Sequence, residues 1–283
     1  MYRQITVVDP KPFVKWAGGK RQIMSDLEKN FPDKFGTYLE PFLGGGAVLF
    51  DLLTKNPSLK CNVSDLNSDL VLAYVTIRDK LGKLIESLEN HSKNYHKDST
   101  GYYYEVRNQE PKNQIEKVSR LLFMNKTCFN GLYRVNSKGK FNVPLGRYTN
   151  PNIVNKENLM SVSHILQSEK IKISCSDFSS IIKYAKSGDF VYFDPPYQPV
   201  SDTANFTSYT HRDFTQDDLE RLADIANQLD SKGCHVMLSN SNSKTVKNLF
   251  PSKWKLKEIK ANRAINSNSQ KRTGYTEIII KNY

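Results

Sequence analysis

The residues best placed to do chemistry are those of Asp194-Pro195-Pro196-Tyr197, which directly follow the apolar run at 190–193. Such a run predicts a buried strand, so the tetrapeptide would leave the carboxyl edge of a sheet, where open α/β sheets bind ligands. An amino group attached to an aromatic base is a poor nucleophile, because its lone pair is conjugated into the ring. A carboxylate and a backbone carbonyl oriented by the prolines could accept its two N–H bonds and so favour an sp³-like nitrogen. Tyr197 could stack on the base. The alternative is a Pro-Pro strand terminator with an exposed Tyr.

A second candidate ligand site is Glu40-Pro41-Phe42-Leu43-Gly44-Gly45-Gly46, between a predicted strand and a predicted helix. Three consecutive glycines let the backbone turn tightly and approach a ligand. The segment lacks both common phosphate-loop patterns, so the ligand need not be a phosphate. Asp65, after the next predicted strand, could bind ribose hydroxyls. The alternatives are a ligand-free turn and, for Asp65, a helix cap.

The elements that must position these residues alternate between strand and helix, which predicts an α/β fold with a parallel sheet. The predicted strands are 37–42, 60–64, 170–175, 190–194, 235–239 and 276–281. The predicted helices are 20–30, 47–53, 68–81, 114–125 and 215–229. Thr215 can cap the last helix, with Asp217 and Asp218 favourably placed in its first turn.

The alternation lapses between Leu81 and Lys170, where Tyr, Asn, Lys and Arg become frequent. We therefore expect one domain formed by residues 1–81 and 170–283, with residues 82–169 inserted into it. Within the insert, Asn130-Gly131 could form the turn of a basic surface β-hairpin.

The charge balance favours a polyanionic partner, since 41 Lys and Arg against 29 Asp and Glu give a net charge of +12 and a pI near 9.3. A basic face near the C-terminus is predicted from Lys244, Lys247, Lys253, Lys255, Lys257, Lys260, Arg263, Lys271, Arg272 and Lys281. The alternative is a basic protein that is merely soluble.

Other residue types argue against a secreted, membrane-bound or metal-dependent protein. The four cysteines, Cys61, Cys128, Cys175 and Cys234, are far apart and indicate reduced intracellular thiols. No apolar stretch reaches the roughly 18 residues of a membrane span. The histidines show no metal-ligand spacing, so no metal is expected. We expect a cytoplasmic monomer without a membrane partner.

Together these segments resemble the Dam family of DNA adenine-N6 methyltransferases, most of all the streptococcal-type enzymes of the alpha group that methylate adenine in GATC. The resemblance covers nearly the whole chain. It is carried by the segments 13–20, 40–46, 64–67, 129–136, 141–148, 194–197, 206–210 and 238–241, in that order.

The resemblance implies a Rossmann-like S-adenosylmethionine-dependent methyltransferase sheet with an inserted, mainly helical target-recognition domain bearing a β-hairpin. Residues 1–81 and 170–283 would be the catalytic domain, and 82–169 the domain that recognises double-stranded DNA. The methyl group of S-adenosyl-L-methionine would pass directly to adenine N6, in GATC, once the base has flipped out. Asp194, Pro195, Pro196 and Tyr197 would form the catalytic site.

The resemblance also implies the cofactor contacts. Asp65 would bind the ribose, Asp177 and Phe178 would lie near the cofactor adenine, and Asp194 near both the methionine end and the target amino group. The full expected set is Trp16, Lys20, Glu40, Phe42, Gly44, Gly45, Gly46, Asp65, Asp177, Phe178 and Asp194. The alternatives are a core role for Trp16, a solvated helix-start Lys20 and a loop-capping Asp177.

For DNA, Arg134 suits bidentate contact with guanine, Leu132 contact with a thymine methyl, and Asn130 polar contact with base or backbone. Phe129 could fill the stack beside the flipped adenine, although the family also uses Tyr here. The expected DNA contacts are Lys15, Phe129, Asn130, Leu132, Arg134, Pro144 and Tyr148.

Two other functions fit parts of the sequence. One is an RNA adenine-N6 or DNA cytosine-N4 methyltransferase. The insert argues against it, and so does Asp194, because cytosine enzymes more often carry Ser at this position. The other is a DNA-binding homologue without activity, which predicts damage to the cofactor segments that is not seen here. A partner restriction enzyme cannot be inferred from residues.

Overall fold

The computed structural model describes residues 8–16, 18–136, 139–197, 214–261 and 275–283. These form two compact units. The helical unit comprises Met1–Ala17, Gly44–Ser58 and Asn67–Ile173, and the sheet unit Gly18–Leu43, Leu59–Leu66 and Ser174–Tyr283. The family-like segment 206–210 and the cations Arg263, Lys271 and Arg272 lie outside the described residues.

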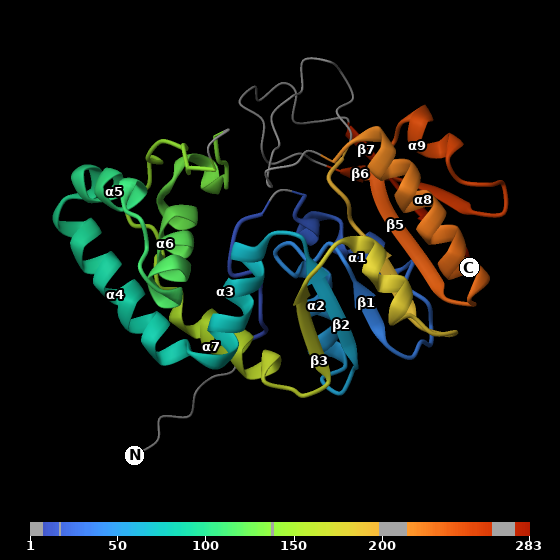
Figure 1. The fold of residues 1–283 in the computed structure, drawn as a ribbon, viewed down its shortest axis with the longest axis horizontal. Helices are drawn as coiled ribbons and strands as arrows, with labels where there is room; N and C mark the ends of the chain where they lie inside the picture. Colours follow the sequence, from blue (N-terminus) through green and yellow to red (C-terminus); the bar gives the residue numbers. More distant parts are fainter. Residues whose placement is uncertain (1–7, 17, 137–138, 198–213, 262–274) are drawn as a thin grey trace. The chain divides into compact units, whose positions relative to one another are not determined.

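A seven-stranded sheet runs in the order β3-β2-β1-β4-β5-β7-β6 (Figure 1). Its strands are β1 Tyr38–Glu40, β2 Cys61–Asp65, β3 Ile171–Cys175, β4 Phe190–Phe193, β5 His235–Ser241, β6 Lys255–Ala261 and β7 Tyr275–Lys281. Strand β1 pairs in parallel with β2 and β4, and β4 with β5. Strand β7 is antiparallel to both β5 and β6. The mixed α/β architecture confirms the predicted fold class.

The strand order reverses between β1 and β4, because the chain proceeds outward through β2 and β3 before it returns to β4 on the other side of β1. At such a switch point a crevice opens outside the carboxyl ends of the strands. Glu40 ends β1, and Asp194–Tyr197 directly follow β4. The topology therefore brings two of the predicted motifs to the edge where ligands bind in this class of fold.

Most predicted elements agree with the structure to within two residues at each end. One predicted helix, 20–30, is instead a 3₁₀ turn at Lys20–Gln22 followed by the short helix α1, Met24–Glu28. Pro32 restricts the backbone just beyond it, which favours an early end. Strand β6 was not predicted, because its three lysines and one glutamate are typical of a solvated surface segment. It is an edge strand, where lysines discourage pairing with other chains.

Helix α8, Gln216–Ser231, covers one face of the sheet (Figure 1). Its side chains Leu222, Ile225 and Leu229 are buried in an apolar cluster with side chains of β4, β5 and β7. The predicted cap is confirmed: Thr215 accepts from the N–H of Asp218, and the Asp218 carboxylate accepts in turn from the N–H of Thr215. This capping box fixes the start of the helix. The short helix α9, Lys244–Asn248, follows β5.

The helical unit is built around α6, which packs against α3, α4 and α5. Its helices are α2 Ala47–Lys55, α3 Ser68–Asp79, α4 Leu81–Lys97, α5 Ser99–Asn108, α6 Gln114–Thr127 and α7 Lys156–Leu166. Helices α4, α5 and α7 were not predicted individually. The buried positions of α4, Leu84, Ile85 and Leu88, do show helical spacing, but they are diluted by Asn, Lys and Tyr.

Beyond α6 the chain forms a minimal antiparallel hairpin, with bridges between Cys128 and Leu145 and between Val135 and Phe141. Tyr103 of α5 supports it, because its hydroxyl donates to the Val143 carbonyl at 2.8 Å. Residues 81–166 are thus mainly helical and carry a hairpin, as the fold prediction required.

Candidate active site

A buried ion pair joins two of the predicted site residues. The Lys20 ammonium lies 2.7 Å from Asp194 Oδ1, and their side chains are only 4% and 17% exposed. Lys20 also donates to the Gly18 carbonyl at 2.7 Å. A lysine so enclosed is not a solvated helix-start residue, and that alternative is wrong. Its enclosure requires a partner charge, which Asp194 provides.

Tyr197 is held on two sides. Its hydroxyl donates to Glu277 Oε2 at 2.7 Å, and the Lys20 ammonium lies 4.7 Å from the centre of its ring. Pro195 is buried and Pro196 exposed. Tyr197 is half-buried and hydrogen-bonded, so the exposed-Tyr alternative is wrong. Glu277, in β7, was missed by sequence reasoning, although an acid beside the apolar run 278–280 is a signal that could have revealed it.

Burial dominates the electrostatics of the carboxylates here. It raises the pKa of Asp194 to about 6, although Lys20 acts in the opposite direction. It also raises the pKa of Glu40 well above its usual value, and the negative charges of Asp194 and Asp65 add to that effect. Among the described residues Glu40 Oε2 is buried and has no hydrogen-bond partner. A cationic or N–H-bearing ligand group beside it would satisfy this oxygen.

Asp65 ends β2, and its carbonyl accepts from the N–H of Ser176 at 3.2 Å. It does not cap the next helix. Asn67 caps α3 by accepting from the N–H groups of Asp69 and Leu70, both at 3.0 Å. The capping alternative for Asp65 is therefore wrong.

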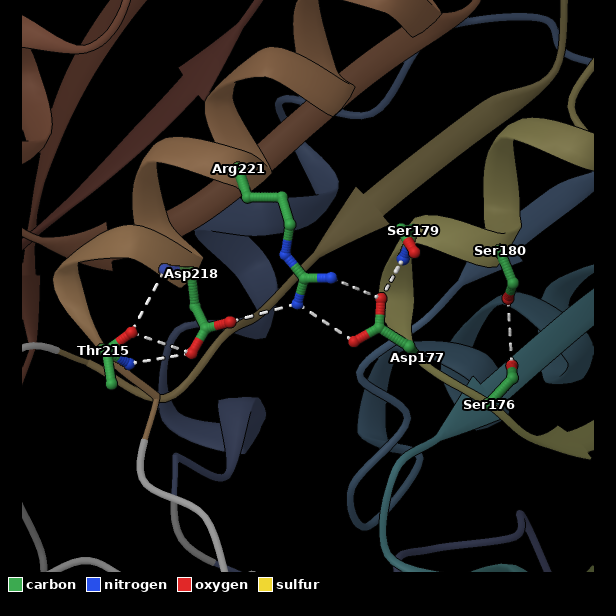
Figure 2. Close-up of polar contacts among 7 residues, drawn as sticks. All are labelled: Ser176, Asp177, Ser179, Ser180, Thr215, Asp218 and Arg221. Atoms are coloured by element: carbon green, nitrogen blue, oxygen red, sulfur yellow. Dashed lines mark hydrogen bonds and ion pairs between the residues drawn. The ribbon is translucent and has the colours of Figure 1, made fainter.

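A 3₁₀ turn, Phe178–Lys183, follows β3. Asp177 directly precedes this turn (Figure 2). Phe178 stacks on Phe42, with ring centres 5.2 Å apart. Asp177 caps the turn, accepting from the N–H of Ser179 at 2.9 Å, and also pairs with Arg221 of α8. Sequence reasoning missed Arg221, because a basic residue that follows acidic residues on an amphipathic helix is typical of the solvent-exposed face.

In the helical unit the glycine turn precedes α2. Gly44 and Gly46 have φ of 50° and 74°, values that L side chains rarely adopt. A Cβ on Gly44 would lie 3.3 Å from Trp16 Cδ1, and one on Gly46 only 2.5 Å from the Tyr74 hydroxyl. The backbone at Gly44 thus closely approaches Trp16. Gly46 is required by packing, because a side chain there would clash with Tyr74. A Cβ on Gly45 would lie 3.3 Å from the Cβ of Pro12.

Trp16 is not ordinary core, since it is partly exposed and stacks on Tyr133, with ring centres 5.2 Å apart. The next predicted DNA contacts cluster around the turn at Asn130-Gly131, whose φ values are 57° and 66°. Leu132 N–H closes the turn by donating to the Phe129 carbonyl at 3.3 Å. Two positive φ values are typical of a type I′ turn, but this turn lies within one arm of the hairpin and does not connect its arms, so the expectation that it closes the hairpin is wrong.

Two aromatic side chains are presented near this turn. Phe129 and Tyr148 are 45% and 40% exposed. The N–H of Phe129 donates to the Pro144 carbonyl at 2.8 Å, and Arg134 Nε donates to Asn142 Oδ1 at 2.9 Å. The two hairpin arms are therefore tied together at both places where DNA contacts are predicted.

Asn125, at the end of α6, is a buried residue that sequence reasoning missed. Its side-chain oxygen accepts from the Lys15 N–H at 2.8 Å, while its amide nitrogen donates to the carbonyls of Lys15 and Gly131 at 2.9 and 3.0 Å. It thereby holds two predicted DNA-contact segments together.

The predicted residues thus gather in two groups. In the sheet unit, Lys20, Glu40, Asp65, Asp194 and Tyr197 influence one another, and Phe42, Asp177 and Phe178 form a second cluster. In the helical unit, Trp16 adjoins Gly44, and Lys15 adjoins Gly131. The described members of the basic C-terminal set lie on α9, β6, β7 and the turn before β6.

Within the described ranges, no group of three or more His, Cys, Asp and Glu side chains could hold a metal ion. None of the helices described is long and apolar enough to cross a membrane.

A family model, that of the D12 class N6 adenine-specific DNA methyltransferases, matches residues 16–265. The chain belongs to this family. Type II methyltransferase M1.LlaDCHI of Lactococcus lactis subsp. cremoris is 44% identical over 282 residues, covering 98% of this chain and 96% of the relative. Type II methyltransferase M.MjaIII of Methanocaldococcus jannaschii is 43% identical over 291 residues, covering 98% and 100%. The DNA adenine methylase of Escherichia coli strain K12 is 30% identical over 275 residues, covering 95% and 94%.

The membership confirms the resemblance drawn from the motifs: the protein is an adenine-specific DNA methyltransferase. In this D12-class methyltransferase, Asp194 is mostly buried and shares the contact of Lys20 with Tyr197.

Proposed function

We propose that this enzyme transfers the methyl group of S-adenosylmethionine to N6 of adenine in double-stranded GATC, by base flipping and direct transfer. The observation that carries the proposal is the carboxylate of Asp194, mostly buried after β4 and flanked by Lys20 and Tyr197. A buried carboxylate beside an aromatic ring matches the needs of a planar base that bears an amino group. The family membership and relatives named DNA adenine methylase support the choice of base and of DNA.

The target amino group would be held by Asp194 and by the Pro195 carbonyl, which together accept its two N–H bonds. Removing these hydrogens from the plane of the ring makes the nitrogen lone pair available for attack. Tyr197 would stack on the adenine, and its hydrogen bond to Glu277 would fix its ring. Pro196 would restrict the backbone between Pro195 and Tyr197. The transfer needs no covalent enzyme intermediate.

S-adenosylmethionine, when bound, supplies a methyl group on a positively charged sulfur. The residues expected to hold it are Trp16, Lys20, Glu40, Phe42, Gly44, Gly45, Gly46, Asp65, Asp177, Phe178 and Asp194. The unsatisfied buried oxygen of Glu40 fits the ammonium group of such a ligand. Asp65 offers a carboxylate for ribose hydroxyls, and the Phe42–Phe178 stack offers an apolar wall for a purine.

DNA recognition is assigned to residues 82–169, with the catalytic domain formed by 1–81 and 170–283. Arg134 would read guanine, Leu132 a thymine methyl, and Asn130, Lys15, Pro144 and Tyr148 would make the remaining contacts. Phe129, with its exposed ring, would fill the space left by the flipped adenine.

The test is transfer of labelled methyl from S-adenosylmethionine to two duplexes that differ only in carrying GATC or GTTC, followed by digestion to nucleosides. Label in N6-methyladenine from the first duplex alone is the expected result, with the Asp194→Ala protein as the blank. Label in both duplexes would discard the site and keep the reaction. Label in N4-methylcytosine, or in RNA alone, would replace the proposal with the corresponding methyltransferase.

The proposal includes a monomer that works in the cytoplasm. Two relatives are named type II methyltransferases, which extends the proposal to a partner nuclease that cuts the same site. Light scattering of the purified protein tests the monomer, and digestion of methylated and unmethylated GATC plasmid by such a nuclease tests the pairing.

A further inference from the structure

Arg221 of α8 holds the carboxylate of Asp177 by two parallel bonds (Figure 2). Its Nη1 donates to Oδ1 at 3.1 Å and its Nη2 to Oδ2 at 3.0 Å. Such a fork fixes the plane of a carboxylate as well as its position. Both side chains are only about 40% exposed, at 42% and 37%.

The arginine is itself held in place. Its Nη2 also donates to Asp218 Oδ1 at 3.0 Å, and Asp218 is fixed by the capping box with Thr215. The guanidinium carbon lies 4.3 Å from the centre of the Phe178 ring. Arg221 therefore touches both Asp177 and Phe178. Through Asp218 it connects Asp177 to the first turn of α8 (Figure 2).

An acceptor position remains on Asp177. An ionised carboxylate has about four lone-pair positions. Oδ1 accepts from Ser179 N–H and from Arg221 Nη1, and Oδ2 accepts from Arg221 Nη2. Within the part of the chain that the structure describes, no second donor is hydrogen-bonded to Oδ2, which leaves one of its lone pairs for a ligand.

We propose that Arg221 is a positioning residue that presents the remaining acceptor of Asp177 to the cofactor purine, so that the site selects a 6-amino purine over a 6-oxo purine. This inference rests on the proposed function, which places Asp177 and Phe178 at the cofactor adenine. Arg221 acts through Asp177 and touches no reacting atom.

The selection follows from which groups donate. A carboxylate can only accept hydrogen bonds, so it pairs with the amino group of adenine and repels the oxygen of hypoxanthine. Partial burial alone would raise the pKa of Asp177, but the hydrogen bonds from Ser179 and Arg221 and the charge of Arg221 outweigh it and lower the pKa. Asp177 therefore stays an acceptor at neutral pH. A site that hydrogen-bonds one substrate group strongly rejects an analogue lacking it.

The experiment is calorimetric titration of the full chain with S-adenosylhomocysteine and with S-inosylhomocysteine, which differ in the 6-substituent of the purine. The wild type is expected to bind the adenosyl compound more tightly. In Arg221→Gln this preference falls about tenfold, the value of one charge-assisted hydrogen bond. Arg221→Lys restores part of it, because a lysine keeps the charge without the fork.

Two further variants complete the design. Asp177→Asn should lose or invert the preference, because an amide can turn its nitrogen toward the 6-oxo group. Arg78→Gln is the matched control, since it removes another bidentate arginine–aspartate pair, with Asp79. It should leave the preference unchanged.

The preference ratio decides the inference, since loss of stability alone would weaken both ligands together. An unchanged ratio in Arg221→Gln, or an equal fall in Arg78→Gln, overturns it while leaving the proposed function intact. If the wild type binds neither compound, the proposed function is wrong, and the inference about Arg221, which rests on it, is wrong as well.

Discussion

The ammonium of Lys20 lies 2.7 Å from the Asp194 carboxylate and 4.7 Å from the centre of the Tyr197 ring. One cation therefore contacts both side chains of the tetrapeptide that are proposed to act on the target base. The pair is mostly buried, so the ionisation of Asp194 depends on the positive charge of Lys20. This dependence makes the ionisation of Asp194 accessible to experiment.

We predict that methyl transfer falls as the pH drops through about 6, where Asp194 takes up a proton. A protonated carboxyl has lost acceptor capacity, so it cannot hold the amino group as the carboxylate does. Burial raises this pKa and Lys20 lowers it, so Lys20→Met should move the acidic limb to higher pH. The measurement is kcat/KM for duplex DNA between pH 5 and 8. An acidic limb that stays in place in Lys20→Met would contradict the assignment.

The Tyr197–Glu277 bond predicts a graded series. Tyr197→Phe keeps the ring and should lower activity by about tenfold to a hundredfold at most, since one hydrogen bond to a charged group is worth about 1.5–3 kcal/mol and about 1.4 kcal/mol corresponds to tenfold. Tyr197→Ala also loses the stacking and should lose considerably more. Glu277→Gln keeps a neutral acceptor and should lose less activity than Tyr197→Phe, and the two changes combined should cost less than their sum. Additive losses would show that the bond does not position the ring.

Site residues that depend on a local sequence pattern were predictable, and those that depend on a distant partner were not. Asp194 and Tyr197 were identifiable because a buried strand delivers them to the ligand-binding edge of the sheet, a local pattern. Thr215 was identifiable because capping is local too. Glu277 and Arg221 were not, because each matters through a partner 80 or 44 positions away. Strand β6 was missed for the same reason: its pairing with β7 is what makes its lysine-rich sequence a strand.

His91 predicts a pH dependence of stability. Burial lowers its pKa to about 4, and its ring stacks on Phe123 with centres 4.9 Å apart. An unfolded chain binds this proton near pH 6.5, so the contribution of the neutral ring is complete above that pH and is lost as the pH falls toward 4. The loss amounts to up to about 3 kcal/mol. Urea unfolding between pH 4 and 7.5 checks it, and His91→Phe should flatten this part of the slope. An equal slope in both proteins would rule out the buried His91 as its origin.

Arg134 predicts a loss of discrimination. If it reads guanine, Arg134→Ala should weaken the preference for GATC over a duplex with that guanine replaced, by about 1–3 kcal/mol. Methylation of the altered duplex should change little. The control is Asn142→Ala, which removes the partner of Arg134 Nε and should have a smaller effect. Equal losses on both duplexes would make Arg134 a phosphate contact instead.

Asn125 and Asn158 allow a matched test of how the DNA-contact segments are held. Each clamps one lysine backbone from both sides: Asn125 that of Lys15, and Asn158 that of Lys11, with bonds of 2.8–2.9 Å. Both asparagines are buried in the helical unit, so Asn125→Ala and Asn158→Ala should each destabilise the protein by about 1–3 kcal/mol.

Only Asn125 also binds the Gly131 carbonyl, and so supports the turn that presents Phe129. Asn125→Ala should therefore raise the KM for duplex DNA about tenfold and reduce the fluorescence gain of 2-aminopurine placed at the target adenine, which reports flipping. Asn158→Ala should leave both unchanged, and cofactor affinity should be the same in the two variants. Both changes remove the same pair of hydrogen bonds to a lysine backbone. An equal rise in KM in the two variants would therefore reflect lost stability, and would show that Asn125 has no specific role in DNA binding.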